Sequence, residues 1–132
     1  MVVDTSALLA IYLSEPDSDR FEAAILNAPA ALISAGTLLE AGIVVEARHG
    51  KAGAVELDNL LKKLGVSTVA VDAEQVEAAR LAFRRYGKGR HPANLNYGDC
   101  FAYALAATSV EPLLFTGDDF SKTDVVNALT AP

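Results

Sequence analysis

Short apolar runs alternate with longer stretches of helical periodicity along the chain, and this alternation limits the possible folds more than any other feature. The expected strands cover residues 1–4, 31–34, 67–71 and 113–115. The expected helices cover residues 7–13, 16–27, 36–49, 54–64, 72–86 and 97–108. Strands that alternate with helices form a parallel sheet through right-handed crossovers. We therefore expect an α/β fold with a central parallel sheet of four or five strands and helices on both faces.

Polar residues and glycines mark the expected ends of these elements. Thr5 or Ser6 is expected to cap the first helix, and Asp72 is expected to cap the helix that ends near Tyr86. Gly50 is expected to end the helix that begins near residue 36. The tail from Asp124 fits either a short strand or a short helix.

The length and composition fit one domain over residues 1–132. With 52% apolar and 21% charged residues, the chain is too apolar to be mainly disordered. Cys100 is the only cysteine, which excludes an internal disulfide and favours a reducing compartment. The early apolar run from Ala7 to Leu13 is about a third of the roughly 20 residues that a membrane span needs. We expect a cytoplasmic protein that is not bound to a membrane.

Four acidic residues are expected near one edge of the sheet. Asp4 ends the first strand and Asp118 follows the last, while Glu40 and Asp99 lie in the early turns of helices. Ligands of open parallel sheets bind beyond the carboxyl ends of the strands, where these side chains can meet. Two like charges about 4 Å apart repel by roughly 4 kcal/mol at a surface-like dielectric, and a hard divalent cation relieves that repulsion.

The types of side chain narrow the choice of ion. His49 and His91 are isolated, so no Cys/His cluster points to zinc. A site made of carboxylate oxygens suits Mg²⁺ or Mn²⁺, which activate water and bind phosphoryl oxygens. Each acid also has a plainer alternative role as a helix cap, a helix-surface charge or a loop residue.

Four segments together resemble one family. The sequences MVVDTSALLA, TLLEAG, NYGDCFAYALA and LLFTGDDF, in this order and spacing, resemble the PIN domain, in particular the VapC-type ribonuclease toxins. The resemblance implies a divalent-metal-dependent endoribonuclease that hydrolyses RNA phosphodiester bonds. It implies that Asp4, Glu40 and Asp99 bind Mg²⁺, with Mn²⁺ as an alternative ion.

The resemblance also implies roles for the loop after the last strand. Asp118 is expected to be the fourth catalytic and metal-binding acid, with Thr116 as its partner. Asp119 competes with Asp118 for this role and is otherwise expected in the second layer around the ion. Ser6 is expected to orient Asp4 or a water molecule from the same second layer.

Basic residues gather in one short stretch of an otherwise acidic chain with a net charge of −6. The stretch contains Arg80, Arg84, Arg85, Lys88 and Arg90 and leads directly into the helix of Asp99. We interpret it as an RNA-binding surface, because phosphate contacts need lysine or arginine. The alternative is a set of cations that complement a helix C-terminus.

The resemblance further implies a VapB-type antitoxin as partner and a homodimer. The high apolar content leaves residues for an exposed groove that an antitoxin segment can occupy. The candidate groove residues, each of which also fits the core, are Leu8, Leu9, Tyr12, Leu38, Leu39, Leu57, Leu60 and Leu61.

Three other interpretations were weighed against a ribonuclease. A haloacid-dehalogenase-type phosphotransferase needs a second aspartate two residues after Asp4, where Ser6 stands. A receiver-like signalling module needs an acidic pair near the first strand, where Asp4 is alone. A PIN-fold module that binds RNA or protein without cleavage activity is the third alternative, and the four acids argue against it.

Overall fold

Four short parallel strands form the central sheet of the structure, a computed structural model that describes all residues 1–132. In spatial order they are β3 (Val66–Val69), β2 (Ala31–Ser34), β1 (Val2–Val3) and β4 (Leu113–Leu114). All three strand pairs are parallel, so the first strand of the chain lies between β2 and the last strand. The predicted α/β fold is confirmed, and the sheet has four strands.

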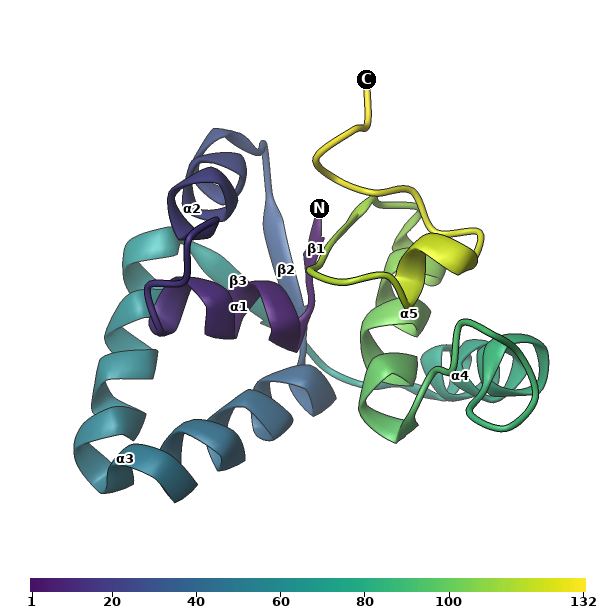
Figure 1. Cartoon of the computed structure of the whole chain (residues 1–132), viewed down its shortest axis with the longest axis horizontal. Coiled ribbons are helices and arrows are strands. Elements are labelled where there is room, and N and C mark those ends of the chain that lie inside the picture. Colours follow the sequence, from purple (N-terminus) through teal and green to yellow (C-terminus); the bar gives the residue numbers. More distant parts are fainter.

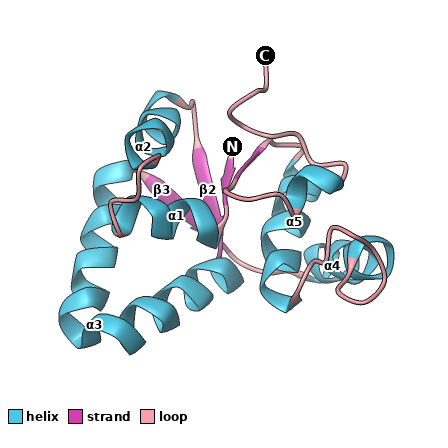
Figure 2. Cartoon of the chain, viewed as in Figure 1, coloured by secondary structure: helices cyan, strands magenta, loops and turns pink.

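Helices cover both faces of this sheet, as Figures 1 and 2 show. One face carries α1 (Thr5–Tyr12), α2 (Ser18–Asn27) and the long α3 (Ala35–Leu64). The other face carries α4 (Ala73–Tyr86), α5 (Tyr97–Ser109) and a short 3-10 helix (Phe120–Lys122). None of these helices combines the length and the apolar character that crossing a membrane requires.

Two hydrophobic cores lie on the two faces of the sheet. Val3, Ile33 and Leu114 belong to the core under α1, α2 and α3, whereas Val2 and Leu113 belong to the core under α4 and α5. Neighbouring residues of a strand point to opposite faces, which explains why consecutive valines and leucines serve different cores. Each of these five side chains is fully buried, a burial that contributes roughly 1.5–3 kcal/mol per side chain.

The cap of α1 is Asp4, which the sequence allows as an alternative role for this acid, and not Thr5 or Ser6. Asp4 has extended backbone angles, and its carboxylate accepts a hydrogen bond from the backbone N–H of Ser6. Thr5 is already the first helical residue, so neither Thr5 nor Ser6 is the cap. Three adjacent residues are all able to cap a helix, and the end of β1 at Val3 decides between them. The prediction that Asp72 caps α4 is confirmed by its hydrogen bond from the N–H of Gln75.

Gly50 interrupts α3 as predicted, but the helix resumes at once. Its backbone angles (φ 64°, ψ −157°) lie in a region that favours glycine and produce a kink within the helix. The predicted second helix from Ala54 therefore begins earlier, directly after this kink. Both halves of α3 lie on the same side of the sheet as α1, and α3 packs against α1 (Figure 1).

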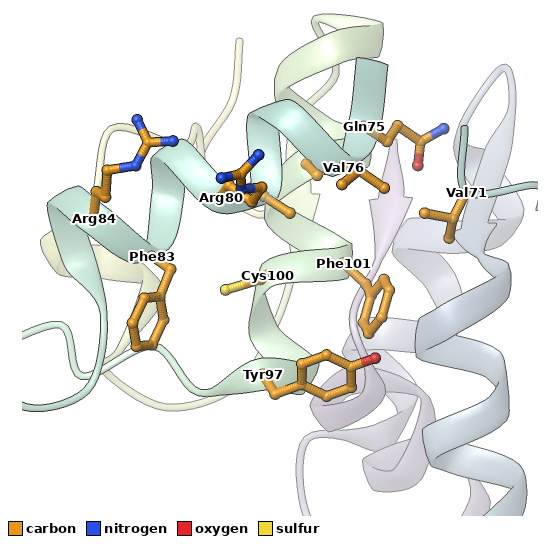
Figure 3. Close-up of a pocket in the computed structure, with 11 residues that line it drawn as sticks. Val71, Gln75, Val76, Arg80, Phe83, Arg84, Tyr97, Cys100 and Phe101 are labelled. Atoms are coloured by element: carbon orange, nitrogen blue, oxygen red, sulfur yellow. The ribbon is translucent and has the colours of Figure 1, made fainter. Parts of the chain in front are cut away.

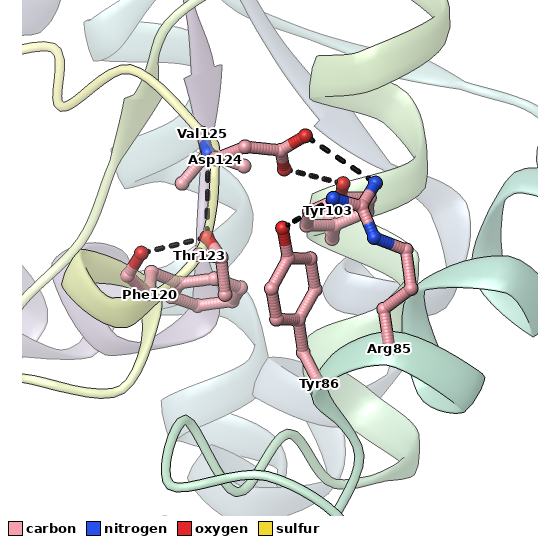
Figure 4. A network of polar contacts seen from close by, with 7 residues as sticks. All are labelled: Arg85, Tyr86, Tyr103, Phe120, Thr123, Asp124 and Val125. Atoms are coloured by element: carbon pink, nitrogen blue, oxygen red, sulfur yellow. Dashed lines mark hydrogen bonds and ion pairs between the residues drawn. The ribbon is translucent and has the colours of Figure 1, made fainter.

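The tail forms neither a regular strand nor an α-helix. It returns to β4, where the N–H of Leu113 donates to the carbonyl of Val126 at 2.8 Å. The hydroxyl of Tyr103 donates to Asp124 at 2.6 Å, and the guanidinium of Arg85 lies 3.6 Å from the same carboxylate (Figure 4). These contacts from α4 and α5 hold the tail against the second core.

Three of the predicted groove residues are core residues. Leu8, Leu57 and Leu61 lie inside the first hydrophobic core, with 9% or less of each side chain exposed. The prediction that they line an exposed groove is wrong, because they lie on the sides of their helices that face the sheet. Leu39, by contrast, is 65% exposed.

Candidate active site

Asp4 is a buried carboxylate at the carboxyl end of β1, with 4% of its surface exposed. One carboxylate oxygen accepts hydrogen bonds from both the N–H and the hydroxyl of Ser6, at 3.0 and 2.6 Å. Burial raises the pKa of Asp4 above its usual value, the bonds from Ser6 oppose this, and the charge of Glu40 adds to the rise. The fold therefore holds a carboxylate whose negative charge is only partly compensated.

Ser6 connects this carboxylate to the loop that follows β4. While its hydroxyl donates to Asp4, the hydroxyl oxygen accepts from the N–H of Thr116 at 3.0 Å. The N–H of Asp4 also donates to the carbonyl of Leu114 in the neighbouring strand. Ser6 thus fixes the position of Asp4 relative to the loop of Asp118 and Asp119.

Glu40 reaches the same edge of the sheet from the early turns of α3. One of its carboxylate oxygens, Oε1, accepts a hydrogen bond of 2.6 Å from the hydroxyl of Thr5. Its carboxylate group also lies against Gly98 of α5: a Cβ built on Gly98 would be 2.6 Å from Cδ of Glu40. Two elements, the first turn of α1 and the first turn of α5, therefore hold this side chain in place.

Asp99 lies in the first turn of α5, where it forms a reciprocal capping box with Asn96. The N–H of Asn96 donates to the carboxylate of Asp99, and the N–H of Asp99 donates to the side-chain oxygen of Asn96, both at 2.9 Å. Burial raises the pKa of Asp99 to about 6, the bond from Asn96 opposes the rise, and the charges of Asp4, Asp119 and Glu40 add to it. Asp4, Asp119 and Glu40 are thus close enough to Asp99 for their charges to act on it.

The two acids of the loop after β4 differ in their surroundings. Both are exposed, but only the charge of Asp119 contributes to the raised pKa of Asp99. Asp119 precedes the 3-10 helix, whereas the carbonyl of Asp118 accepts a hydrogen bond from Ser121. The charges of Asp4, Glu40 and Asp119 therefore act on Asp99, and Asp118 is not among them.

The chemistry of these donors fits a hard divalent cation. All are carboxylate oxygens. Burial raises the pKa values of Asp4 and Asp99, the charges of nearby acids add to the rise, and no cationic side chain opposes it. In their present positions no three of these side chains form a complete set of ligands. Mg²⁺ keeps several water molecules and binds directly to one or two carboxylates, so it does not need three.

A groove between α4 and α5 carries two of the predicted RNA-binding residues. It has a volume of about 580 Å³ and a mainly apolar lining. Figure 3 shows Arg80 and Arg84 of α4 on one side and Tyr97 of α5 on the other. Tyr97 is 80% exposed, packs edge to face on Phe101, and precedes Asp99 by two residues. We call this feature the α4–α5 groove.

The remaining basic residues have different surroundings. Arg85 points to the tail, where it donates to the hydroxyl of Tyr86 and pairs with Asp124 (Figure 4). Arg90 lies over the ring of Phe83, 5.7 Å from its centre, and Lys88 is exposed in the loop before α5. The basic stretch therefore divides into two arginines at the α4–α5 groove, one that holds the tail, and two cations in the loop.

Thr5 and Gly98 contact Glu40, and neither was predicted as a site residue. Thr5 was considered only as a helix cap. One feature of the sequence could have indicated a role for Gly98. It lies directly before Asp99 in the first turn of a helix, where glycine has no conformational advantage.

Comparison with known proteins shows the family of the chain. The family model described as the PIN domain matches residues 1–126. A protein named Ribonuclease VapC from Mycolicibacterium smegmatis is 56% identical over 125 residues, which are 95% of this chain and 97% of that protein. Ribonuclease VapC30 from Mycobacterium tuberculosis is 54% identical and covers 95% of both chains.

Solved structures show the same fold at lower sequence identity. The crystal structure of VapC20 from Mycobacterium tuberculosis, described as a Sarcin-Ricin loop cleaving toxin, superimposes with a TM-score of 0.76 at 20% identity and covers 95% of both chains. VapBC2 from Rickettsia felis, bound to a DNA fragment from its promoter, gives a TM-score of 0.73 at 16% identity over 96% of this chain and 94% of that chain. With its acids at the carboxyl edge of a four-stranded parallel sheet, the chain belongs to the PIN-domain family and, within it, to the VapC ribonucleases.

Proposed function

We propose that this chain is a divalent-metal-dependent endoribonuclease that hydrolyses RNA phosphodiester bonds at the carboxylate cluster. The observation that carries the proposal is the environment of Asp99: burial raises its pKa to about 6, and the charges of three acids from other parts of the chain add to the rise. Carboxylates crowded in this way bind a divalent cation in place of protons. The relatives named as VapC ribonucleases support RNA as the substrate.

Asp4, Asp99 and Glu40 would hold Mg²⁺, or Mn²⁺ in its place, together with one acid of the loop after β4. The predicted fourth acid is Asp118. The effect of the Asp119 charge on Asp99 supports Asp119 for this role instead. When bound, the ion neutralises phosphate oxygens and lowers the pKa of water, so that hydroxide is available near neutral pH.

The chain's own residues fix the geometry of the reaction. Ser6 holds Asp4, Asn96 holds Asp99, and Thr5 holds Glu40, each through a hydrogen bond of 3.0 Å or less. Glu40 is placed to accept a proton from the attacking water, since one of its oxygens accepts no hydrogen bond from the protein. Attack in line with the leaving oxygen gives a 5′-phosphate and a 3′-hydroxyl.

Arg80 and Arg84 would bind the RNA backbone along the α4–α5 groove. They offer positive charge to phosphate in a chain whose net charge is −6, and Arg80 also pairs with the exposed Glu77 at 3.1 Å. Tyr97 adds an exposed aromatic ring at the opposite side of the groove. Lys88 and Arg90, in the loop that precedes α5, extend the proposed surface, whereas Arg85 is already bound to Asp124.

Digestion of total RNA tests the reaction. The purified chain is incubated with RNA in Mg²⁺, in Mn²⁺ or in EDTA, and the cleavage ends are mapped. We expect cleavage only with the divalent ions, and its loss in Asp99→Asn, with folding checked by circular dichroism. RNA that binds with measurable affinity but stays intact under all conditions would favour the PIN-fold module without cleavage activity.

A pair of charge reversals tests the RNA surface. Arg84→Glu is compared with Arg48→Glu, because both change the net charge equally and Arg48 is an exposed residue of α3 without an ion pair. We expect Arg84→Glu alone to weaken RNA binding and to reduce the slope of log affinity against log salt by about 1. Equal weakening in both variants would show a nonspecific effect of net charge.

The partner proposed for this toxin-like chain is a VapB-type antitoxin. The VapBC2 complex of Rickettsia felis supports such a partner. Leu39 and Ile43, one turn apart on α3, are 65% and 60% exposed and form an apolar surface on that helix, whereas the other candidates Leu9, Tyr12 and Leu38 are partly buried against the first core. We expect Leu39→Glu to abolish copurification with the antitoxin while the chain stays folded.

A homodimer and a cytoplasmic location complete the proposal. Light scattering of the purified chain measures the first, and cell fractionation measures the second. The dimer and the cytoplasmic location both agree with an RNA substrate. The single cysteine, Cys100, is buried, and burial raises the pKa of its thiol, as expected of an unreactive cysteine.

A further inference from the structure

The first turns of α3 and α5 approach each other through two glycines. A Cβ built on Gly36 of α3 would lie 2.5 Å from Cγ of Phe101 on α5. One built on Gly98 of α5 would lie 2.6 Å from Cδ of Glu40 on α3. Each helix therefore places a side chain in the space that a Cβ would occupy on the other. One of those two side chains is an acid of the candidate active site.

We propose that Thr5 and Gly98 are positioning residues that together hold the Glu40 carboxylate in its working place. We call this pair the Thr5–Gly98 seat. The inference rests on the proposed function, because it assigns Glu40 a place in the same metal-binding and catalytic site.

Thr5 supplies the only hydrogen bond that Glu40 receives from the protein. Thr5 is 9% exposed, and its hydroxyl lies 2.6 Å from Oε1 of Glu40, compared with 3.5 Å from the carbonyl of Thr37. A hydroxyl has one proton, and the shorter distance assigns that proton to Glu40. A glutamate loses much rotamer freedom when it is held in one position, so a fixed carboxylate needs such a partner.

Gly98 supplies the space. Its φ is not positive, so its backbone conformation is open to any residue, and alanine favours a helix more than glycine does. All three atoms nearest to a Cβ at this position belong to the end of the Glu40 side chain. The reason for glycine here is therefore the carboxylate and not the backbone. Because that side-chain end is flexible, a methyl group at residue 98 displaces Glu40 and leaves the fold intact.

Two matched glycine substitutions separate the site from the fold. Gly98→Ala is compared with Gly42→Ala, since Gly42 is also helical and a Cβ there meets nothing within 4 Å. We expect both variants to melt at or above the wild-type temperature. Only Gly98→Ala should lower kcat, by roughly 10- to 100-fold, with KM for RNA changed by less than about twofold, and weaken Mn²⁺ binding measured by calorimetry without RNA. A Gly98→Ala protein with wild-type kcat and Mn²⁺ affinity would overturn the proposal.

Two substitutions of Thr5 test the hydrogen bond. Thr5→Val keeps the shape and removes the hydroxyl, whereas Thr5→Ser keeps the hydroxyl. We expect Thr5→Ser to retain most of kcat and of Mn²⁺ affinity, and Thr5→Val to lose both to the same extent as Gly98→Ala. Equal kcat in the valine and serine variants would refute the role of Thr5.

A wild-type protein that cleaves no RNA would refute the proposed function. Unfolding experiments would still test the Thr5–Gly98 seat in that case. In metal-free protein, Gly98→Ala should raise the melting temperature more in a Glu40→Ala background than in the wild type, because no carboxylate then has to move. Strictly additive effects of the two substitutions would show that Gly98 and Glu40 do not interact, and the seat would be rejected.

Discussion

Replacing Asp99 with asparagine should stabilise the metal-free protein at neutral pH. The pKa of this carboxyl is raised from 3.8 to about 6, first by burial and then by the charges of Asp4, Asp119 and Glu40. Because the folded state binds the proton more tightly than the unfolded state, Asp99 favours folding most below pH 4, and this contribution is lost as the pH rises through about 6. Asparagine is neutral at every pH and avoids the loss.

The size of the effect follows from the shift. About 2 pH units at 1.36 kcal/mol per unit give about 3 kcal/mol as the cost of ionising Asp99 in the folded protein. Asparagine can still accept the hydrogen bond from the N–H of Asn96, but it loses a favourable negative charge at a helix N-terminus, about 0.3–1 kcal/mol. The 3 kcal/mol is an upper limit because solvent screens this partly exposed carboxyl, so the net gain is about 1 kcal/mol at pH 8, or about 4 °C in Tm for a chain of this size.

Urea denaturation of both proteins in EDTA, at steps from pH 4 to pH 8, measures this difference. The variant should gain stability over the wild type as the pH rises between 4 and 7, while groups common to both proteins cancel in the comparison. Adding Mn²⁺ at pH 8 should stabilise the wild type and leave Asp99→Asn almost unchanged. A variant that is less stable than the wild type at pH 8 without metal would refute the charge crowding on which the active site is argued.

Two further predictions concern the loop after β4. Ser6→Ala removes the acceptor of the Thr116 N–H and should cost about 1–3 kcal/mol in urea denaturation, and an unchanged stability would mean that water replaces the serine. Asp119→Asn should lower the pKa of Asp99 in the metal-free protein, whereas Asp118→Asn should not, as followed by ¹³C NMR titration of the carboxyl groups. The opposite order of the two shifts would place the charge of Asp118 nearer to Asp99.

The gathering of acids from distant parts of the chain was predictable because the sheet is parallel. Parallel strands all present their carboxyl ends at one edge, so an acid directly after β1, such as Asp4, and one that follows β4 must share that edge. Asp99 was predictable in the same way from its place in the first turn of a helix, which Asn96 caps. Local signals of this kind depend on a few neighbouring residues and can be read without knowing how helices pack.

Contacts between helices were not predictable, because nothing local records them. The sequence shows a threonine after Asp4 and a glycine before Asp99, but only the approach of α3 to α5 brings both to Glu40. The same limit explains the error at Leu57. An apolar stripe on a helix looks alike whether it faces the sheet or an exposed groove, and the packing of the whole domain decides between the two.

The link from Asp4 through Ser6 to Thr116 joins residues 110 positions apart, and β4 adds to the sheet beside β1. During synthesis the first strand leaves the ribosome long before its neighbour on that side exists. The hydrogen bonds that fix Asp4 on this side can form only after Leu114 and Thr116 have been translated. A growing chain therefore reaches the arrangement described for Asp4 more than 100 residues after Asp4 itself is made, a delay that suits a protein whose proposed activity destroys RNA.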